Sequence, residues 1–170
     1  MAGDERKIKC VVWDLDGTLW DGTLLEGDRV ALRDGILPVL KTLDARGILQ
    51  SVASRNHEAD ALGKLREFGL ADYFLYPQIH FGSKAESIAA IATSINIGKD
   101  TLAFVDDQPF ERDEVRFSHP EVLCLDAADA GSLLDLPEMN PRFVTEDSAQ
   151  RRRLYLADIQ RNREEAGFGG

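Results

Sequence analysis

Short apolar runs alternate along the chain with stretches in which apolar residues recur every three or four positions. The runs are typical of buried strands, whereas the second spacing places apolar side chains on one face of a helix. The pattern predicts strands over residues 9–13, 48–53, 73–76, 102–105 and 121–125. It predicts helices over residues 35–46, 57–68, 84–95 and 110–117, and a loop or small hairpin over residues 18–33.

The end of the chain departs from this alternation. Residues 146–166 form a long, highly charged helix candidate, which Thr145 can cap. Strands that alternate with helices indicate right-handed βαβ units. We therefore expect an α/β fold with three layers, a Rossmann-like, doubly wound parallel sheet. A catalytic domain is expected over residues 1–136 and a C-terminal extension over residues 137–170.

Polar side chains follow three of the predicted strands, at the point where each strand ends. These segments are Asp14-Leu15-Asp16, Ser54-Arg55-Asn56 and Asp106-Asp107. Open parallel sheets bind their ligands outside the carboxyl ends of the strands. Three segments that are distant in sequence are therefore expected to bring two pairs of acids, a hydroxyl and a guanidinium to one crevice.

Such a group of carboxylates indicates a metal-assisted reaction. Carboxylates that lie close together repel one another unless a cation lies between them, and oxygen ligands suit Mg²⁺. Asp14 can then attack phosphorus to give an aspartyl-phosphate, while Asp16 protonates the leaving group and later activates water. Gly17 lets the backbone turn away from the strand, and the Thr18 hydroxyl can hold this turn.

A bound phosphate also needs hydrogen-bond donors. Lys84, at the start of its predicted helix, opposes the helix dipole, and the conflict disappears if it faces a phosphate or the aspartates. We expect Lys84 to take part in catalysis. The Ser54 hydroxyl and the amides that open the next helix can donate to the same anion. The residues expected to bind substrate or phosphate are Ser54, Arg55, Asn56, Gly17 and Thr18.

Each of these signals has a simpler explanation when it is taken alone. An Asp-x-Asp sequence usually marks a turn, Lys84 and Arg55 can be surface residues, and Asp106-Asp107 can cap a helix. A calcium-binding EF-hand loop is opposed by Leu19 and Leu25, which stand where its glycine and its final glutamate are needed. Because the signals occur together, each in its place after a strand, they favour one active site.

Composition narrows the possible functions. The 170 residues carry a formal net charge of −10, which disfavours general binding to nucleic acid or to anionic membranes. No apolar stretch is long enough to span a membrane, and the first residues lack the apolar core of a signal peptide. The two cysteines, Cys10 and Cys124, suggest neither a disulfide scaffold nor a zinc cluster. We expect a cytoplasmic protein.

Taken in order over residues 9–126, the motifs resemble those of the haloacid dehalogenase (HAD) superfamily of phosphatases. The resemblance implies Asp14 as nucleophile and Asp16 as acid/base, with Ser54 and Lys84 as the second and third motifs. It also implies that Mg²⁺ is held by the Asp14 carboxylate, the backbone carbonyl of Asp16 and Asp106, with Asp107 close by or acting through water. The intervals between motifs leave no room for a large cap domain, so the site is expected to be open.

Finer features are similar to subfamily IIIC, in particular residues 16–20, 53–56 and 105–112. This subfamily includes small magnesium-dependent phosphatases and the FkbH-like domains of polyketide pathways, which the segment from Thr145 to Tyr155 also resembles. Some FkbH-like domains load a glyceryl group onto an acyl carrier protein by means of a reactive cysteine. Here Leu15 stands between the two aspartates, and Cys10 is expected to lie buried about 13 Å along the strand from Asp14. Both features favour hydrolysis.

We therefore expect a Mg²⁺-dependent phosphatase in a natural-product pathway of the polyketide type. Its substrate would be a phosphorylated small molecule or one tethered to a carrier protein. One alternative is an FkbH-like glyceryl transferase that takes an acyl phosphate and loads an acyl carrier protein. The other is a non-catalytic module that binds partners through residues 146–166.

Overall fold

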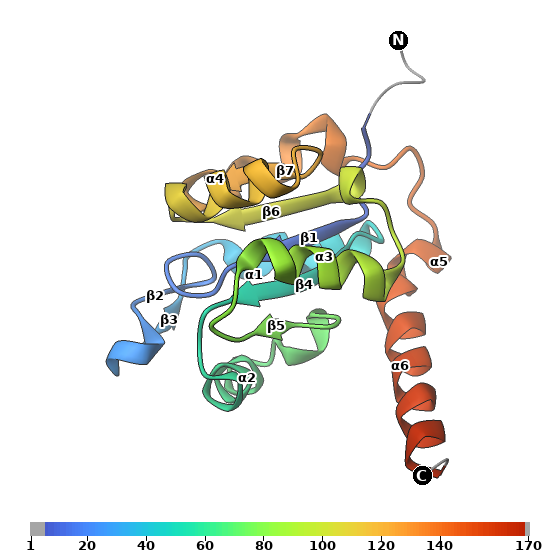
Figure 1. Cartoon of the computed structure of the whole chain (residues 1–170). Helices are drawn as coiled ribbons and strands as arrows, with labels where there is room; N and C mark the ends of the chain where they lie inside the picture. The colour runs from blue at the N-terminus through green and yellow to red at the C-terminus, as the bar shows by residue number, and fades with distance from the viewer. Residues whose placement is uncertain (1–5, 169–170) are drawn as a thin grey trace.

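The computed structural model describes residues 6–168, and its centre is a parallel sheet (Figure 1). Within these residues the sheet has five strands in the order β5-β4-β1-β6-β7. The strands are β1 (Cys10–Trp13), β4 (Leu49–Ser54), β5 (Gln78–Ile79), β6 (Leu102–Asp106) and β7 (Leu123–Asp126). β1 lies in the middle of the sheet and pairs in parallel with β4 and β6.

Helices cover both faces of this sheet. They are α1 (Ile36–Ala45), α2 (Glu58–Glu67), α3 (Lys84–Ile95) and α4 (Pro109–Ser118). Successive side chains of β1 point to opposite faces: Val11 and Trp13 join the core with α1 and α2, whereas Cys10 and Val12 join the core with α3 and α4. The three-layer, doubly wound α/β fold is therefore confirmed.

Only small elements lie between the strands that carry the candidate site. After β1, the short strands β2 (Trp20–Asp21) and β3 (Ala31–Leu32) pair as an antiparallel hairpin around the 3₁₀ turn η2 (Leu24–Glu26). This agrees with the predicted hairpin. Between β4 and α3 lie α2, the 3₁₀ turn η3 (Ala71–Tyr73) and β5. No cap domain is inserted at either place in the described residues.

The strand β5 does not lie at residues 73–76, where the apolar run predicted a strand. Residues 73–76 do not form a strand, because Tyr73 ends η3 and Tyr76 has a φ of 50°, outside the strand region. Phe74 makes a single bridge to Gln50, and the strand β5 follows Pro77 instead. The apolar side chains of this run are buried against the core without a regular strand, which hydrophobicity cannot distinguish from a strand.

The predicted C-terminal helix is two helices. The turn α5 (Glu146–Ala149) is separated by Gln150 from α6 (Arg151–Phe168). Thr145 caps the first of them, as expected, and its hydroxyl accepts a hydrogen bond from the Ser148 amide at 3.1 Å. The break occurs where Ser148 is buried against Gly47 at the end of α1, so that α5 contacts α1 before α6 turns away.

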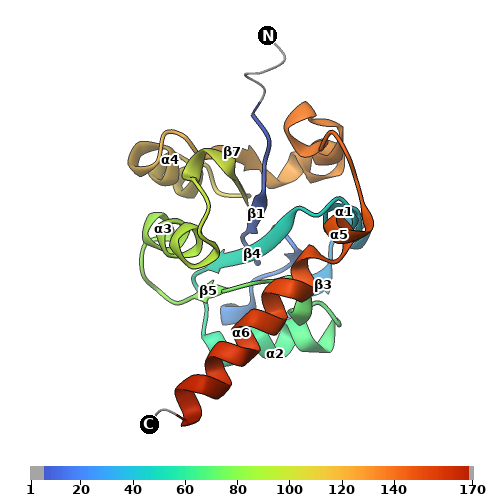
Figure 2. The same ribbon diagram turned by 90° about the vertical axis from the view of Figure 1, so that its right-hand side faces the viewer.

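The C-terminal segment packs on the sheet and its helices (Figure 2). Tyr155, Leu156 and Ile159 of α6 lie against the core that contains α3 and α4. The 3₁₀ turns η5 (Ala127–Asp135) and η6 (Pro137–Met139) connect β7 to this segment, and Met139 is fully buried. The division into domains 1–136 and 137–170 stays a prediction, and residues 1–5 and 169–170 lie outside the described residues.

Candidate active site

The candidate site lies at the carboxyl ends of the three central strands. Asp14 follows β1, whereas Ser54 and Asp106 are the last residues of β4 and β6. Because Trp13 pairs with Val52 and with Val105, the three strands end at nearly the same level and present these side chains together. A cavity of about 310 Å³ opens here, and its lining includes Asp14, Asp16, Gly17, Ser54, Arg55, Lys84 and Asp107.

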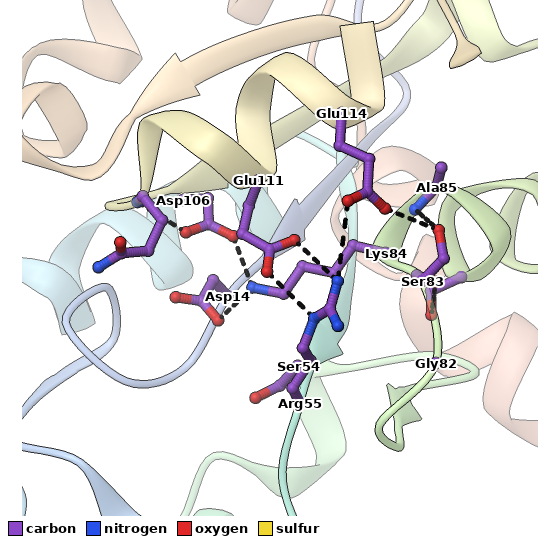
Figure 3. A network of polar contacts seen from close by, with 12 residues as sticks. Asp14, Ser54, Arg55, Gly82, Ser83, Lys84, Ala85, Asp106, Glu111 and Glu114 are labelled. Carbon is purple, nitrogen blue, oxygen red and sulfur yellow. Dashed lines mark hydrogen bonds and ion pairs between the residues drawn. The ribbon is translucent and has the colours of Figure 1, made fainter. Parts of the chain in front are cut away.

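Lys84 connects the first and last of these strands (Figure 3). Its Nζ lies 2.9 Å from Asp14 Oδ1 and 2.6 Å from Asp106 Oδ2. Lys84 is the first residue of α3, and the hydroxyl of Ser83 caps this helix by accepting from the Ala85 amide. The helix start thus places a cation between two buried carboxylates, as the conflict with the helix dipole suggested. The alternative that Lys84 is a surface residue is wrong, because its side chain is only 5% exposed.

The buried charges perturb one another strongly. Burial raises the pKa of the Asp14 carboxyl well above its usual range, although the neighbouring Lys84 ammonium acts in the opposite direction. Burial likewise raises the pKa of Asp106. Burial lowers the pKa of Lys84, but the two carboxylates raise it by more, so that its net shift is upward. The cluster without a further cation therefore holds its protons more tightly than isolated carboxyl groups do.

Three carboxylates are close enough to share one metal ion. Oxygen atoms of Asp14, Asp106 and Asp107 lie within 4.8 Å of one another. All three are hard oxygen donors, two of the three residues are buried, and an added divalent cation would relieve their repulsion. The donor set therefore fits Mg²⁺. The carboxylate of Asp16 is not part of this group, and metal binding by its backbone carbonyl stays a prediction.

The Asp16 carboxylate is held instead by the hairpin and by the segment after β4. Its Oδ1 accepts hydrogen bonds from Trp20 Nε1 at 2.7 Å and from the Leu24 amide at 3.1 Å. Its Oδ2 accepts from Asn56 Nδ2 at 3.2 Å. Trp20 both packs in the core and contacts the site, because its ring is fully buried and its N–H donates to Asp16.

Thr18 and Gly17 shape the loop after β1. The Thr18 hydroxyl donates to Asp14 Oδ2 at 3.1 Å, so it holds the Asp14 carboxylate. Gly17 has a φ of +75°, and a Cβ at this position would lie 2.8 Å from Asp107 Cγ. Only glycine therefore lets the loop approach Asp107 without displacing it. Thr18 is fully buried, and a contact of either residue with phosphate stays a prediction.

The segment after β4 is divided between the cavity and the interior. Ser54 and Arg55 line the cavity, whereas Asn56 is 1% exposed. The Asn56 Nδ2 donates to Ser54 Oγ at 2.8 Å as well as to Asp16. Contact of Ser54, Arg55 and Asn56 with phosphate stays a prediction, and for Asn56 the observed contacts are with other site residues.

Arg55 crosses the cavity to α4 (Figure 3). Its Nε lies 3.0 Å from Glu111 Oε1, and its Nη2 lies 3.8 Å from Glu114 Oε2. Glu114 also accepts a hydrogen bond from the Ser83 hydroxyl at 2.9 Å. Arg55 is thus both an ion-pair residue and part of the cavity wall. Sequence reasoning missed Glu111 and Glu114, whose spacing of three on one helix face was the available signal.

Comparisons with known proteins find relatives in sequence and in fold. No protein-family model matches the chain. The sequence is 31% identical over 139 residues to human magnesium-dependent phosphatase 1, covering 71% of this chain and 78% of the relative.

Two solved structures are also similar. One is the N-terminal part of the protein BF1531 from Bacteroides fragilis, which contains a phosphatase domain complexed with Mg; it has a TM-score of 0.63 and 28% identity. The match covers 92% of this chain but 41% of that one, so the present chain spans less than half of its length. A HAD-superfamily hydrolase from Ehrlichia chaffeensis shares the fold, with a TM-score of 0.59 at 17% identity, over 72% of this chain and 88% of that one.

Proposed function

Because the chain belongs to the same family as magnesium-dependent phosphatase 1, within the HAD superfamily, we propose that it is a Mg²⁺-dependent phosphatase with Asp14 as its nucleophile. One observation carries the proposal: the Lys84 ammonium contacts both Asp14 and Asp106 in a buried cluster at the carboxyl ends of the sheet. Burying charged groups lowers the stability of a fold. Clusters of such groups in a cavity are therefore typical of functional sites.

The metal would be held by Asp14, Asp106 and Asp107, together with the Asp16 backbone carbonyl that the family resemblance implies. When bound, Mg²⁺ offsets the negative charge of the phosphoryl group and of the carboxylates around it. Lys84 contributes a fixed positive charge next to Asp14 and Asp106. Thr18 donates to the second oxygen of Asp14, so hydrogen bonds orient both oxygens of the nucleophile before the substrate arrives.

In the first step an Asp14 oxygen attacks the phosphorus of the substrate. A new P–O bond to Asp14 forms as the P–O bond to the leaving group breaks, and Asp16 donates a proton to the leaving oxygen. Trp20, the Leu24 amide and Asn56 hold the Asp16 carboxylate for this transfer. Ser54 and the ion-paired Arg55 supply donors to the non-bridging phosphoryl oxygens.

In the second step water attacks the aspartyl-phosphate. Asp16, now a carboxylate, removes a proton from the water as its oxygen bonds to phosphorus, and the P–O bond to Asp14 breaks. The products are inorganic phosphate and free Asp14, and Asp16 has regained the proton it began with. Atoms and charge therefore balance over the two steps without any further reactant.

The substrate we propose is a phosphorylated small molecule. In the described residues only the hairpin β2–β3 extends over the first motif, and its residues Gly22 and Thr23 line the cavity. Such an open site accepts a substrate without closure of a separate domain. None of the described helices combines the length and the apolar character that crossing a membrane requires.

Within the superfamily we place the chain in subfamily IIIC and in a polyketide-type pathway, on the strength of its similarity to FkbH-like domains. We nevertheless prefer hydrolysis to loading of a glyceryl group onto an acyl carrier protein. Cys10 is fully buried at the start of β1, burial raises the pKa of its thiol, and it does not line the cavity. Transfer through a protein thiol needs an accessible thiolate beside Asp14.

The test is phosphate release from a panel of phosphomonoesters and acyl phosphates, with Mg²⁺ and with a chelator. Asp14→Asn should abolish release, and Asp129→Asn, which makes the same change on an exposed residue, should not. Mass spectrometry of the same reactions, with a phosphopantetheinylated carrier protein present, shows whether the acyl group moves to the carrier. Full activity of Asp14→Asn, or gain of the acyl mass by the carrier, would contradict the proposal.

A further inference from the structure

A second cavity lies at the opposite end of the sheet from the candidate active site. It has a volume of about 380 Å³, and its lining includes Lys9 and Ile48. These residues directly precede β1 and β4, whose other ends lead to Asp14 and Ser54. Four strand residues span about 13 Å, so this cavity is separate from the cluster of aspartates.

The lining of this cavity is strongly basic. Its cationic residues come from four segments of the chain and are Lys7, Lys9, Arg46, Arg142 and Arg151, whereas its one acidic residue is Glu138. The whole chain has 20 basic and 30 acidic residues. If charged residues were distributed evenly over the molecule, this cavity would contain more acidic than basic side chains. Because the rest of the molecule is acidic, this cavity is a local positive region that concentrates small anions.

Backbone carbonyls hold several of these cations in place. Arg46 Nη1 donates to the carbonyls of Leu134 and Met139, each at 3.0 Å. Arg151 Nη1 donates to the Gly47 carbonyl at 2.8 Å. Carbonyls orient a guanidinium without neutralising its charge, and each group keeps further N–H donors for a ligand. The arginines are therefore positioned in advance, which lowers the entropy lost when an anion binds.

Two further cations of the lining, Lys9 and Arg142, are exposed. Among residues 6–168, neither of them nor Arg46 or Arg151 forms an ion pair with a carboxylate. Elsewhere in this acidic chain, the basic residues Arg55, Lys84 and Arg152 each have an acidic partner. Lys9, Arg46, Arg142 and Arg151 therefore contribute positive charges that no carboxylate within residues 6–168 pairs with.

We propose that this basic cavity binds a small polyanion of the diphosphate class, at a site distinct from the active site. Planar guanidinium groups match phosphate oxygens with paired hydrogen bonds. The three arginines approach from the end of α1, from residue 142 and from the start of α6, so they can contact one ligand from several sides. Such a ligand would also connect α6 to the sheet.

The experiment uses inorganic diphosphate as the probe and the full chain without Mg²⁺, in the presence of a chelator. Binding is followed by calorimetry and by the backbone amide shifts of the ¹⁵N-labelled protein. Shifts at Lys9, Gly47 and Ile48 report the basic cavity, whereas shifts at Gly17 and Thr23 report the active site. We expect the shifts to concentrate in the first group.

A double variant tests which cations matter. Lys9→Gln with Arg142→Gln should weaken binding by about tenfold or more, because two charged contacts are removed. The matched variant, Lys41→Gln with Arg66→Gln, makes the same change of charge at two exposed residues away from the cavity and should leave the affinity within about twofold. Thermal unfolding checks that both variants fold. The proposal is overturned by an equal loss in both variants, by shifts confined to the active site, or by no measurable binding.

Discussion

Among single residues, Trp20 has a clear role beyond packing. Its indole N–H makes the shortest of the three hydrogen bonds to the Asp16 carboxylate. An acid/base group must keep its orientation toward the leaving oxygen, and a displacement of about 1 Å can cost a hundredfold in rate. Trp20 is therefore a positioning residue for Asp16, although it does not line the cavity itself.

Replacing Trp20 tests this role. Trp20→Phe keeps an aromatic ring but removes the donor, so kcat should fall by about tenfold or more while KM changes little. Trp13→Phe is the matched control, because Trp13 is equally buried and its indole donates to Gln50 at 3.0 Å instead. Both variants should lose stability, but Trp13→Phe should largely keep its kcat. If Trp20→Phe and Trp13→Phe lost kcat equally, the effect of Trp20 would be explained by packing alone.

Lys84 is expected to stabilise the fold as well as the reaction. Its removal leaves the buried carboxylates of Asp14 and Asp106 without their cation. In chelator, Lys84→Met should therefore lower the free energy of unfolding by about 3 kcal/mol. Lys64→Met, which removes an ion pair with Glu67 and a cation–π contact with Phe68, should cost less than about 1 kcal/mol.

The pH dependence of this loss has a defined sign. Burial raises the pKa values of Asp14 and Asp106, so without Lys84 these groups take up protons as the pH falls, which relieves their repulsion. Urea unfolding of Lys84→Met should show a larger loss at pH 8 than at pH 5. A loss that does not change with pH would mean that the carboxylates are not the source of the effect.

At the level of elements, Arg152 attaches the first turn of α6 to the rest of the molecule. Arg152 pairs with Asp44 of α1 at 2.8 Å, donates to the Asp72 carbonyl at 3.0 Å and stacks over Tyr73. The hydrogen bond from Arg152 to Asp44 is the largest cause of a raised pKa of this arginine. One side chain thus joins α6, α1 and η3.

This attachment predicts unequal effects of neighbouring arginines. Arg152→Ala should lower the free energy of unfolding by about 1–2 kcal/mol, because a partly buried charged pair and a cation–π contact are lost. Arg153→Ala is the control: Arg153 is exposed, and its replacement should change stability by less than about 0.5 kcal/mol. Chemical denaturation measures the free energy of unfolding of both variants. Similar losses in the two variants would contradict the proposed attachment through Arg152.

For the molecule as a whole, metal binding and protonation should compete. The net charge of −10 favours approach of a divalent cation. In the metal-free protein, however, the raised pKa values of Asp14 and Asp106 mean that protons occupy the site to a higher pH than ordinary carboxyl groups would allow. Mg²⁺ binds the carboxylate form, so its binding must release protons below these raised pKa values.

The apparent affinity for Mg²⁺ should therefore rise with pH, by up to about tenfold per pH unit for each proton released, and level off above the raised pKa values. Calorimetry in two buffers that differ in ionisation enthalpy counts the released protons. Asp129→Asn, which changes an exposed acid, should leave this dependence as it is. A metal affinity that is constant between pH 5 and about pH 8 would show that the cluster is already ionised.

Much of the molecule could be predicted because it depends on local pattern. β1, β4 and β6 are apolar runs whose ends are marked by polar residues, so Asp14, Ser54 and Asp106 could be placed together from topology alone. Residues 73–76 could not be assigned correctly, because a buried apolar run is compatible with strand or with irregular backbone. The break at Gln150 was missed for a related reason, since it depends on the contact of Ser148 with Gly47.

The sequence by itself determined the alternation of strands and helices along the chain, the strands β1, β4, β6 and β7, and the residues at the carboxyl ends of the three central strands. It could do so because strand burial and helix periodicity are properties of neighbouring residues. Only the tertiary structure decided that Lys84 lies between Asp14 and Asp106, that Trp20 holds Asp16, and that Glu111 pairs with Arg55. Only the tertiary structure shows that four segments of the chain together form the basic cavity. Most of these contacts join residues that are distant in the chain, so they depend on how the layers pack. The contact of Trp20 with Asp16 depends on the direction in which the loop after β1 turns the two side chains.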